Sequence, residues 1–197
     1  MFLKTVFNLQ AKRYFKTASE LFIYHSNYQA ALEAIEKSLA LEPNNPRAVV
    51  LYADILFCFQ REMESLAVLD DLIQKSPDYV EAFISRASVL EALGKHREAL
   101  DDCNLALTAI GKGKHYLYAS VYEQKISLLI ALKLFRSTES VLDEAWQNLD
   151  LDDYDYLLMT CRNQQRQARQ KQLRQRQDVG STMSVISTSP PLKLVKG

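Results

Sequence analysis

The chain has 197 residues, of which 48% are hydrophobic and 24% are charged, proportions typical of one globular domain with a sizeable core. The formal net charge is zero, but residues 162–197 hold eight Lys or Arg and one acid, whereas the residues before them hold 16 basic and 23 acidic side chains. The sequence therefore joins an acidic body to a basic extension. No run of eighteen apolar residues occurs, which argues against a membrane-spanning helix.

The start of the chain and its cysteines bear on where the protein works. Residues 1–11 contain an apolar stretch that is too short for a signal peptide, and no small-residue cleavage site follows it. We expect this segment to lead into the first helix. Cys58, Cys103 and Cys161 form no CxxC pair, and each falls in a helical pattern. Reduced thiols and a cytoplasmic location are the expectation.

A period of 34 residues runs through the middle of the chain. Leu32, Leu66 and Leu100 are identical at this spacing, and Pro43 matches Pro77 as a residue that ends a helix. Agreement in one register at many positions indicates a structural repeat. The further matches are Ala31 with Ser65 and Ala99, Ser38 with Leu72 and Ala106, Leu39 with Ile73 and Leu107, Val49 with Phe83, and Ala53 with Ala87.

Two segments resemble tetratricopeptide repeats. Residues 27–45, NYQAALEAIEKSLALEPNN, resemble the second helix and exit turn of one repeat, and residues 93–100, LGKHREAL, resemble the turn between the helices of another. The resemblance implies an all-α fold, a right-handed superhelical solenoid of three to four helical hairpins plus a C-terminal capping helix. Stacked hairpins share one continuous core. The repeats are expected at 12–45, 46–79 and 80–113, with a fourth that fits less closely at 119–152.

The remainder of the chain is expected to cap this array. Tyr154, Leu157 and Cys161 lie at apolar helical spacing after an acidic start, which favours a capping helix over residues 153–177. The later part of that helix is almost wholly Arg and Gln and has little to bury. Residues 178–197 are rich in Ser, Thr and Pro, and their composition predicts a disordered tail.

The resemblance also implies where a partner would bind, because the functional surface of the family is the concave face lined by the first helix of each repeat. The corresponding positions form an apolar stripe flanked by charge, which suits an extended or helical peptide. The alternative is that the apolar residues pack against neighbouring helices or the tail. The positions are Arg13, Lys16, Glu20, Ile23 and Tyr24, then Arg47, Val50, Asp54, Phe57 and Cys58, then Glu81, Ile84, Ser88 and Glu91, and finally Ser120, Glu123, Ser127 and Ile130.

Some tetratricopeptide co-chaperones grip a C-terminal carboxylate through Lys and Asn in the first repeat, Asn in the second, and Lys and Arg in the third. Lys16 matches the first of these residues. The other four positions hold Glu20, Leu51, Glu81 and Ser85. These four departures argue against a chaperone-tail clamp.

The Arg/Gln segment offers a second surface. Arg162, Arg166 and Arg169 fall on one helix face and could contact an anionic surface, either a membrane or a nucleic acid. No aromatic residues are interleaved with them, so a solvated helix end that contacts the acidic body is the competing interpretation. We expect neither nucleic acid nor membrane as the main partner.

Catalytic and metal-site patterns are not found. His25, His96 and His115 lie in separate turns without ligand spacing, so no metal site and no nucleophile–histidine pair is predicted. Residues 111–115, GKGKH, lack the spacing of a phosphate-binding loop. Paired acids such as Asp101 and Asp102 are expected on solvated helix faces. No cofactor and no enzymatic activity are expected.

The sequence therefore predicts a protein–protein interaction module that holds a partner segment in the concave groove, as an adaptor, assembly factor or chaperone-like protein. The alternative is a self-associating scaffold, a homo-oligomer whose basic tail docks to an anionic surface. The exposure of the apolar groove residues distinguishes the two.

Overall fold

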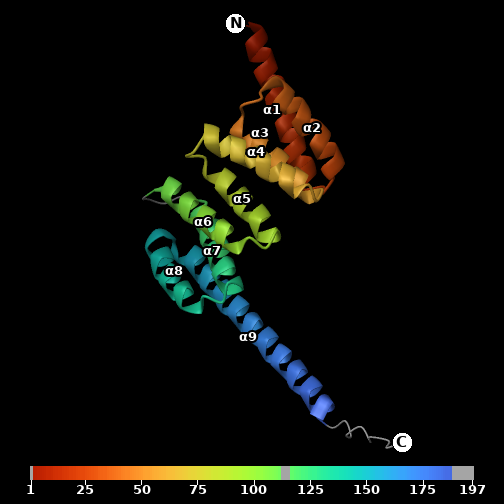
Figure 1. Ribbon diagram of the computed structural model, residues 1–197. Coiled ribbons are helices and arrows are strands. Elements are labelled where there is room, and N and C mark those ends of the chain that lie inside the picture. Colours follow the sequence, from red (N-terminus) through yellow and green to blue (C-terminus); the bar gives the residue numbers. More distant parts are fainter. Residues whose placement is uncertain (1, 112–115, 188–197) are drawn as a thin grey trace, which may run out of the picture.

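The computed structural model describes residues 2–111 and 116–187, which fold into helices joined by short turns, with no strand in these ranges. This confirms the predicted all-α class. The chain runs from one end of an elongated molecule to the other (Figure 1). The helices are α1 (Phe2–Ile23), α2 (Tyr28–Leu41), α3 (Pro46–Cys58), α4 (Glu62–Lys75), α5 (Val80–Ala92), α6 (His96–Ile110), α7 (Tyr118–Ala131), α8 (Phe135–Asn148) and α9 (Leu151–Ser187).

The first eight helices form four stacked hairpins. Consecutive helices pair as α1 with α2, α3 with α4, α5 with α6 and α7 with α8, and each hairpin then packs on the next (Figure 1). Helix α3 begins at Pro46 and α5 at Val80, the first residues of the second and third predicted repeats. Helix α9 packs mainly on α7 and therefore takes the place that the first helix of a further hairpin would occupy.

The turn inside each hairpin repeats the same backbone conformation. Ser26, Gln60 and Gly94 lie 34 residues apart, and all three have positive φ angles of 48°, 59° and 73°. Lys133 has φ 61° at the equivalent place in the fourth hairpin. Left-handed backbone closes the end of a helix by satisfying its last carbonyls, and glycine adopts it without a steric penalty. Only Gly94 made this turn recognisable in the sequence.

Asparagine marks the start of two helices. The side-chain oxygen of Asn27 accepts a hydrogen bond from the backbone N–H of Ala30 at 3.2 Å, and that of Asn45 accepts one from Ala48 at 3.4 Å. Pro46 then occupies the first turn of α3, where its missing N–H costs nothing. The run Pro43 to Pro46 thus ends one hairpin and begins the next.

Small residues allow the helices to approach closely. Ala31, Ala53, Ala87 and Ala99, the matched positions of the 34-residue period, are all completely buried. Larger side chains fill the space between hairpins, and Leu69 is among those with no exposed surface. Since every hairpin buries its apolar face against its neighbours, the core is continuous along the solenoid.

A buried ion pair crosses the third hairpin. Arg86 on α5 donates to both carboxylate oxygens of Asp102 on α6, at 2.6 and 2.8 Å, and to Asp70 on α4 at 2.6 Å. Asp102 is only 3% exposed. The expectation that Asp102 lies on a solvated face was therefore wrong. Arg86 turns what would be an outward-facing acid into part of the packing between three helices.

The first and last helices extend beyond the boundaries predicted from the sequence. Helix α1 begins at Phe2, so residues before 12 extend the first helix and do not merely lead into it. Helix α9 continues to Ser187, past residue 178 where a disordered tail was expected. Residues 178–187 contain no Gln, Arg or Lys, so high helix propensity does not explain this extension; extending an existing helix adds one hydrogen bond per residue without a new nucleation step. The rest of that predicted tail, 188–197, lies outside the described residues.

Hydropathy gives no indication of a membrane span: none of the described helices is both long enough and apolar enough to cross a bilayer.

Candidate partner-binding groove

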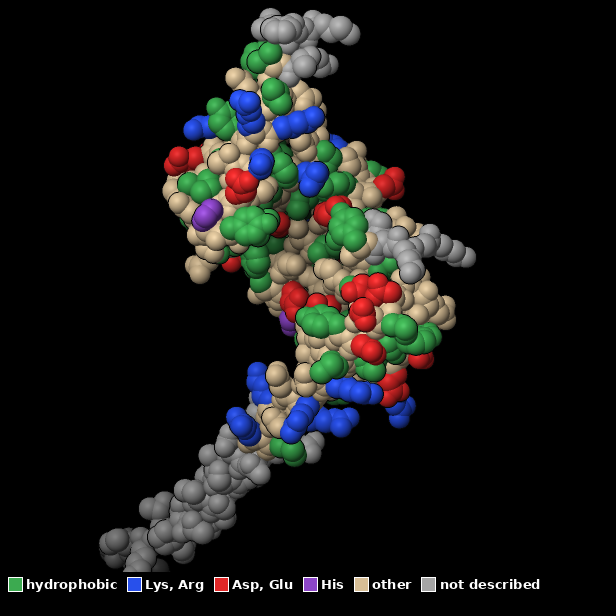
Figure 2. All heavy atoms as spheres, turned by 180° about the vertical axis from the view of Figure 1, so that it is seen from behind, with side chains coloured by type: hydrophobic (Ala, Val, Ile, Leu, Met, Phe, Trp, Pro, Cys, Tyr) green, Lys and Arg blue, Asp and Glu red, His purple; other side chains and the backbone are tan. Residues whose placement is uncertain are grey.

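The first helices of the hairpins lie side by side along one face of the solenoid. Helix α1 contacts α3, α3 contacts α5, and α7 contacts α9. Helices α5 and α7 are joined by side-chain hydrogen bonds. Figure 2 shows a hollow in the middle of one face, with hydrophobic side chains beside it and acidic ones gathered toward its C-terminal side. Basic side chains gather near the N-terminal end and where α9 leaves the body.

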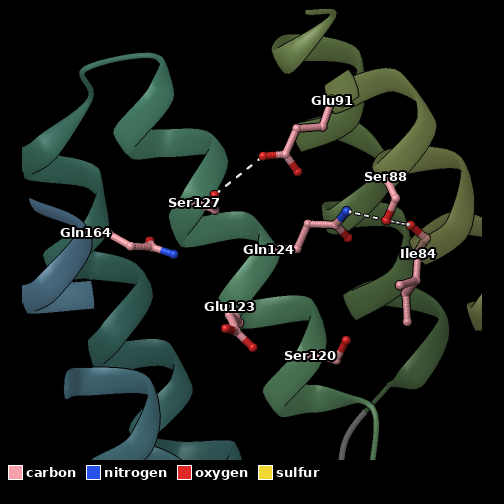
Figure 3. Close-up of a pocket in the computed structure, with 8 residues that line it drawn as sticks. All are labelled: Ile84, Ser88, Glu91, Ser120, Glu123, Gln124, Ser127 and Gln164. Carbon is pink, nitrogen blue, oxygen red and sulfur yellow. Dashed lines mark hydrogen bonds between the residues drawn. The ribbon is translucent and has the colours of Figure 1, made fainter. Parts of the chain in front are cut away.

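An open pocket of about 300 Å³ lies in this face between α5, α7 and α9 (Figure 3). Helix α5 contributes an apolar side chain, a hydroxyl and a carboxylate, and α7 contributes a further carboxylate. The capping helix α9 completes the wall with an amide. The lining residues are Ile84, Ser88, Glu91, Ser120, Glu123, Gln124, Ser127 and Gln164.

Polar contacts hold α7 against α5 along this wall. Gln124 Nε2 donates to Ser88 Oγ at 3.0 Å, and one turn further on Ser127 Oγ donates to Glu91 Oε1 at 3.4 Å (Figure 3). At the other end of the two helices, the Tyr116 hydroxyl donates to Glu81 Oε1 at 2.8 Å. Short polar side chains at these positions leave space between the two helices, because they do not interdigitate as apolar side chains would.

The predicted residues of the first repeat all lie at the surface. Arg13, Lys16 and Glu20 are on the outside of α1, and Lys16 pairs with Glu20 at 3.7 Å. Ile23 ends the helix with 63% of its surface exposed, and Tyr24 follows with 77% exposed. Two large apolar side chains are therefore free for contact at this end of the groove.

The second repeat divides into buried and accessible positions. Arg47 and Cys58 are exposed, with the Arg47 guanidinium 5.5 Å from the centre of the Phe15 ring. Phe57 is half-buried, whereas Val50 is only 9% exposed and packs in the core with Leu69 and its neighbours. Val50 therefore offers almost no surface to a partner.

The third and fourth repeats supply the pocket itself. Glu81, Ile84, Ser88 and Glu91 are half-buried on α5, and all except Glu81 line the pocket. In the fourth repeat Ser120, Glu123 and Ser127 line it as well, whereas Ile130 is 8% exposed and belongs to the core.

Sequence reasoning missed two pocket residues. Gln124 occupies the position equivalent to Ser85 when the five extra residues of the fourth repeat are counted, so the repeat register could have identified it. Gln164 lies on the capping helix, outside the repeats. Treating α9 as the first helix of a further hairpin would have placed it on the groove face.

Acidic side chains accumulate in the C-terminal half of the groove. Glu81, Glu91 and Glu123 are half-buried, and within the described residues none of the three lies within 4.0 Å of a Lys or Arg nitrogen. Asp54 on α3 adds a fourth carboxyl, hydrogen-bonded to Ser85 on α5. Burial raises the pKa of Asp54 from 3.8 to about 6, and the bond from Ser85 opposes part of that rise.

Replacing Asp54 with asparagine should stabilise the protein above pH 6. The raised pKa means that the folded chain binds a proton more tightly than the unfolded chain, so wild-type stability falls as the pH rises from about 4 through about 6. Asparagine avoids this charging penalty, worth up to about 3 kcal/mol at neutral pH. Urea denaturation at pH 4 and pH 7.5 measures the effect. A gain from Asp54→Asn that is equal at both values would contradict it.

The basic residues of the capping helix face solvent beside the pocket wall. Arg162, Arg166 and Arg169 are all exposed on a segment that also packs on the body through Gln164 and Ala168, and α9 then projects away from the hairpins (Figure 1). Between Arg162 and Arg166, α9 is anchored by Gln165, whose Nε2 donates to the Thr138 hydroxyl at 2.9 Å. In the described ranges no group of three or more His, Cys, Asp or Glu side chains is placed to hold a metal ion.

Comparison with known proteins agrees with this architecture. Residues 16–62 match the tetratricopeptide repeat family model. No curated protein sequence matches the chain. Among solved structures, a thermophilic TPR protein from Thermus thermophilus is 19% identical, with a TM-score of 0.62, covering 90% of this chain and 97% of that one.

Two further structures show the same likeness. MamA from Desulfovibrio magneticus RS-1 is 14% identical, covering 82% of this chain and 90% of that one with a TM-score of 0.56. The first TPR of Spaghetti (RPAP3), solved with the HSP90 peptide SRMEEVD, is 17% identical, covering 64% of this chain and 95% of that one with a TM-score of 0.55. The resemblance noted in residues 27–45 is thereby confirmed, and the chain has the tetratricopeptide repeat fold.

Proposed function

We propose that the protein is a protein-interaction module that binds a peptide segment of a partner along the groove formed by its first helices, as an adaptor, assembly factor or chaperone-like protein of the cytoplasm. The observation that carries the proposal is the open pocket between α5, α7 and α9, whose half-buried walls combine an apolar side chain with carboxylates. A site of this kind gives both contact area and orientation to a bound segment.

The exposed apolar residues extend this surface beyond the pocket. Ile23 and Tyr24 lie at the N-terminal end of the groove, and Phe57 lies between them and the pocket in repeat order. An extended peptide could use such separated anchors, with the pocket as one of several contact points. Arg13, Lys16 and Arg47 are also exposed and add positive charge to the first two repeats.

The partner should differ from an acidic chaperone tail. The RPAP3 domain is solved with a peptide that ends in Glu-Glu-Val-Asp. In this chain Glu20 and Glu81 occupy two of the positions that hold Asn and Lys in the carboxylate clamp, and Leu51 is buried at 8% exposure. A carboxylate placed there would meet like charge instead of cations.

Ile84→Arg provides the test. The full chain is immobilised, peptides are selected from a phage-displayed library of random sequences, and an enriched peptide is synthesised for fluorescence anisotropy. Because Ile84 lines the pocket and is only half-buried, arginine there should fill the site without unfolding the helix, and affinity should fall at least about tenfold. Met63→Arg is the matched control, since Met63 is 72% exposed on α4, a second helix.

Two results would count against the proposal. The first is that no peptide is enriched over the empty support. The second is that Ile84→Arg and Met63→Arg bind the selected peptide as tightly as wild type, with unchanged helicity and melting temperature. Either would favour the second candidate, a scaffold that contacts an anionic surface through Arg162, Arg166 and Arg169, which rests on the exposure of these three side chains on α9.

A further inference from the structure

The pocket between α5, α7 and α9 is lined by carboxylates, hydroxyls and amides, with no Lys or Arg among its lining residues. The Ser88 hydroxyl donates to the backbone oxygen of Ile84 at 3.1 Å, and the Gln124 amide donates to Ser88 at 3.0 Å. The Ser127 hydroxyl donates to Glu91 at 3.4 Å. Three side-chain donors are therefore already engaged inside the wall, whereas a carboxylate has about four lone-pair positions and Glu91 uses one of them.

The unused acceptors belong to carboxylates that the described part of the chain does not neutralise. Among the described residues, Glu123 makes no hydrogen bond or ion pair to the side chains around it, and Glu91 receives only the Ser127 hydroxyl. Both are half-buried in the pocket walls, and both lie on the face where acidic side chains gather (Figures 2 and 3). Half-buried charge of one sign, without an internal counter-ion, is most stable when a partner brings the opposite charge.

The third wall of the pocket is formed by α9, which contributes Gln164. Its side chain comes from α9 and points toward α7 in Figure 3, and its Oε1 is buried without a donor in the described structure. Its amide nitrogen, drawn nearer to α7, is an uncharged donor. None of the three helices therefore contributes a positively charged N–H donor to the lining of the pocket.

We propose that this pocket receives a cationic side chain of the bound peptide, an arginine in preference to a lysine. The inference rests on the proposed peptide-binding function and specifies its partner. A guanidinium offers five N–H donors in a planar fork, so one group can satisfy carboxylates on both α5 and α7 while its stem lies on Ile84. The ammonium of lysine offers three donors from a single point and matches acceptors on separate helices less well.

The distribution of charge along the groove supports an arginine site in this pocket. The basic side chains Arg13, Lys16 and Arg47 lie at the other end of the groove, so the charge of the surface changes sign along its length. A peptide with acidic residues at one end and an arginine at the other would match both halves in one direction only. Charge complementarity would then fix the orientation and register of the bound segment.

The test uses the peptides selected on the full chain. Their consensus should contain Arg, or less often Lys, at one fixed position, and a synthetic twin with citrulline at that position should bind roughly tenfold more weakly. Citrulline keeps the shape of arginine and removes its charge. The double variant Glu91→Gln/Glu123→Gln should bind the arginine peptide roughly tenfold more weakly than wild type, and should no longer distinguish it from the citrulline twin.

The control removes the same charge elsewhere. Glu36→Gln/Glu139→Gln changes two exposed glutamates on α2 and α8 and should keep both the affinity and the preference for arginine, which separates a local contact from the effect of net charge. Helicity and melting temperature establish that both double variants are folded.

The outcomes distinguish the arginine pocket from the peptide-binding function on which it rests. If peptides bind in the groove but carry no basic residue at a fixed position, the arginine pocket is wrong and the peptide-binding function stands. An arginine preference that survives Glu91→Gln/Glu123→Gln unchanged would also overturn it. If the library yields no binding peptide, both proposals fail together. Concentration-dependent dimers that disappear in Arg169→Gln/Arg174→Gln would show that the arginine comes from a second copy of the chain.

Discussion

Arg86→Leu is expected to lower the free energy of unfolding by about 3–5 kcal/mol, because it leaves the carboxylate of Asp102 buried without its counter-ion. Arg86 binds Asp102 through two hydrogen bonds of 2.8 and 2.6 Å and also contacts the Phe83 ring, with 5.8 Å between the guanidinium carbon and the ring centre. Urea denaturation followed by circular dichroism measures the loss.

The partners of Arg86 provide the controls. Asp70→Asn should cost less than about 1 kcal/mol, since Asp70 lies at the surface with 54% of its side chain exposed. Arg86→Leu/Asp102→Leu removes both buried charges together and should recover most of the lost stability. If Arg86→Leu costs no more than Asp70→Asn, the buried pair does not have the role that its geometry indicates.

Val50→Arg is expected to unfold the second hairpin, at a cost of more than about 4 kcal/mol, because a charged side chain would enter a core with no partner for it. Val50 packs with Ala53, Leu69 and Val89, although its position in the repeat belongs to the groove. Thermal melting of Val50→Arg beside Ile84→Arg provides the measurement. Both positions are predicted groove residues, yet only the second variant should melt close to wild type.

A folded Val50→Arg protein with normal helicity would contradict this placement. It would mean that residue 50 faces solvent and that α3 is rotated about its axis relative to the structure. Asp54, one turn further along α3, would then lose the burial that raises its pKa, so Asp54→Asn would have no pH-dependent effect on stability. The two measurements therefore test the same packing independently.

The repeat register was readable from the sequence because packing constrains it strongly. Alanine at 31, 53, 87 and 99 is required where helices touch, and the 34-residue spacing follows from the length of two helices and their turns. The left-handed turn residues Ser26 and Gln60 were not recognisable, since neither residue type is specific for that backbone conformation. Their place became clear only from the equivalent Gly94.

The groove was readable only in part, because a repeat position does not determine how deeply a side chain is buried. Val50 and Ile84 are equivalent residues one repeat apart, but Val50 is covered by the core around Leu69 whereas Ile84 lines an open pocket. Burial depends on the size of side chains from other helices, which a pattern within one helix does not contain. Asp102 shows the same point, since its counter-ion lies sixteen residues away.

Hydrogen–deuterium exchange of the full chain, with and without a selected peptide, tests the central claim most directly. We expect bound peptide to slow amide exchange in α5, in α7 and in the part of α9 around Gln164, because these helices surround the pocket and are tied together when it is filled. Helices α2, α4, α6 and α8 should change little. Protection confined to those second helices, or to α9 beyond residue 169, would contradict a binding site in the groove.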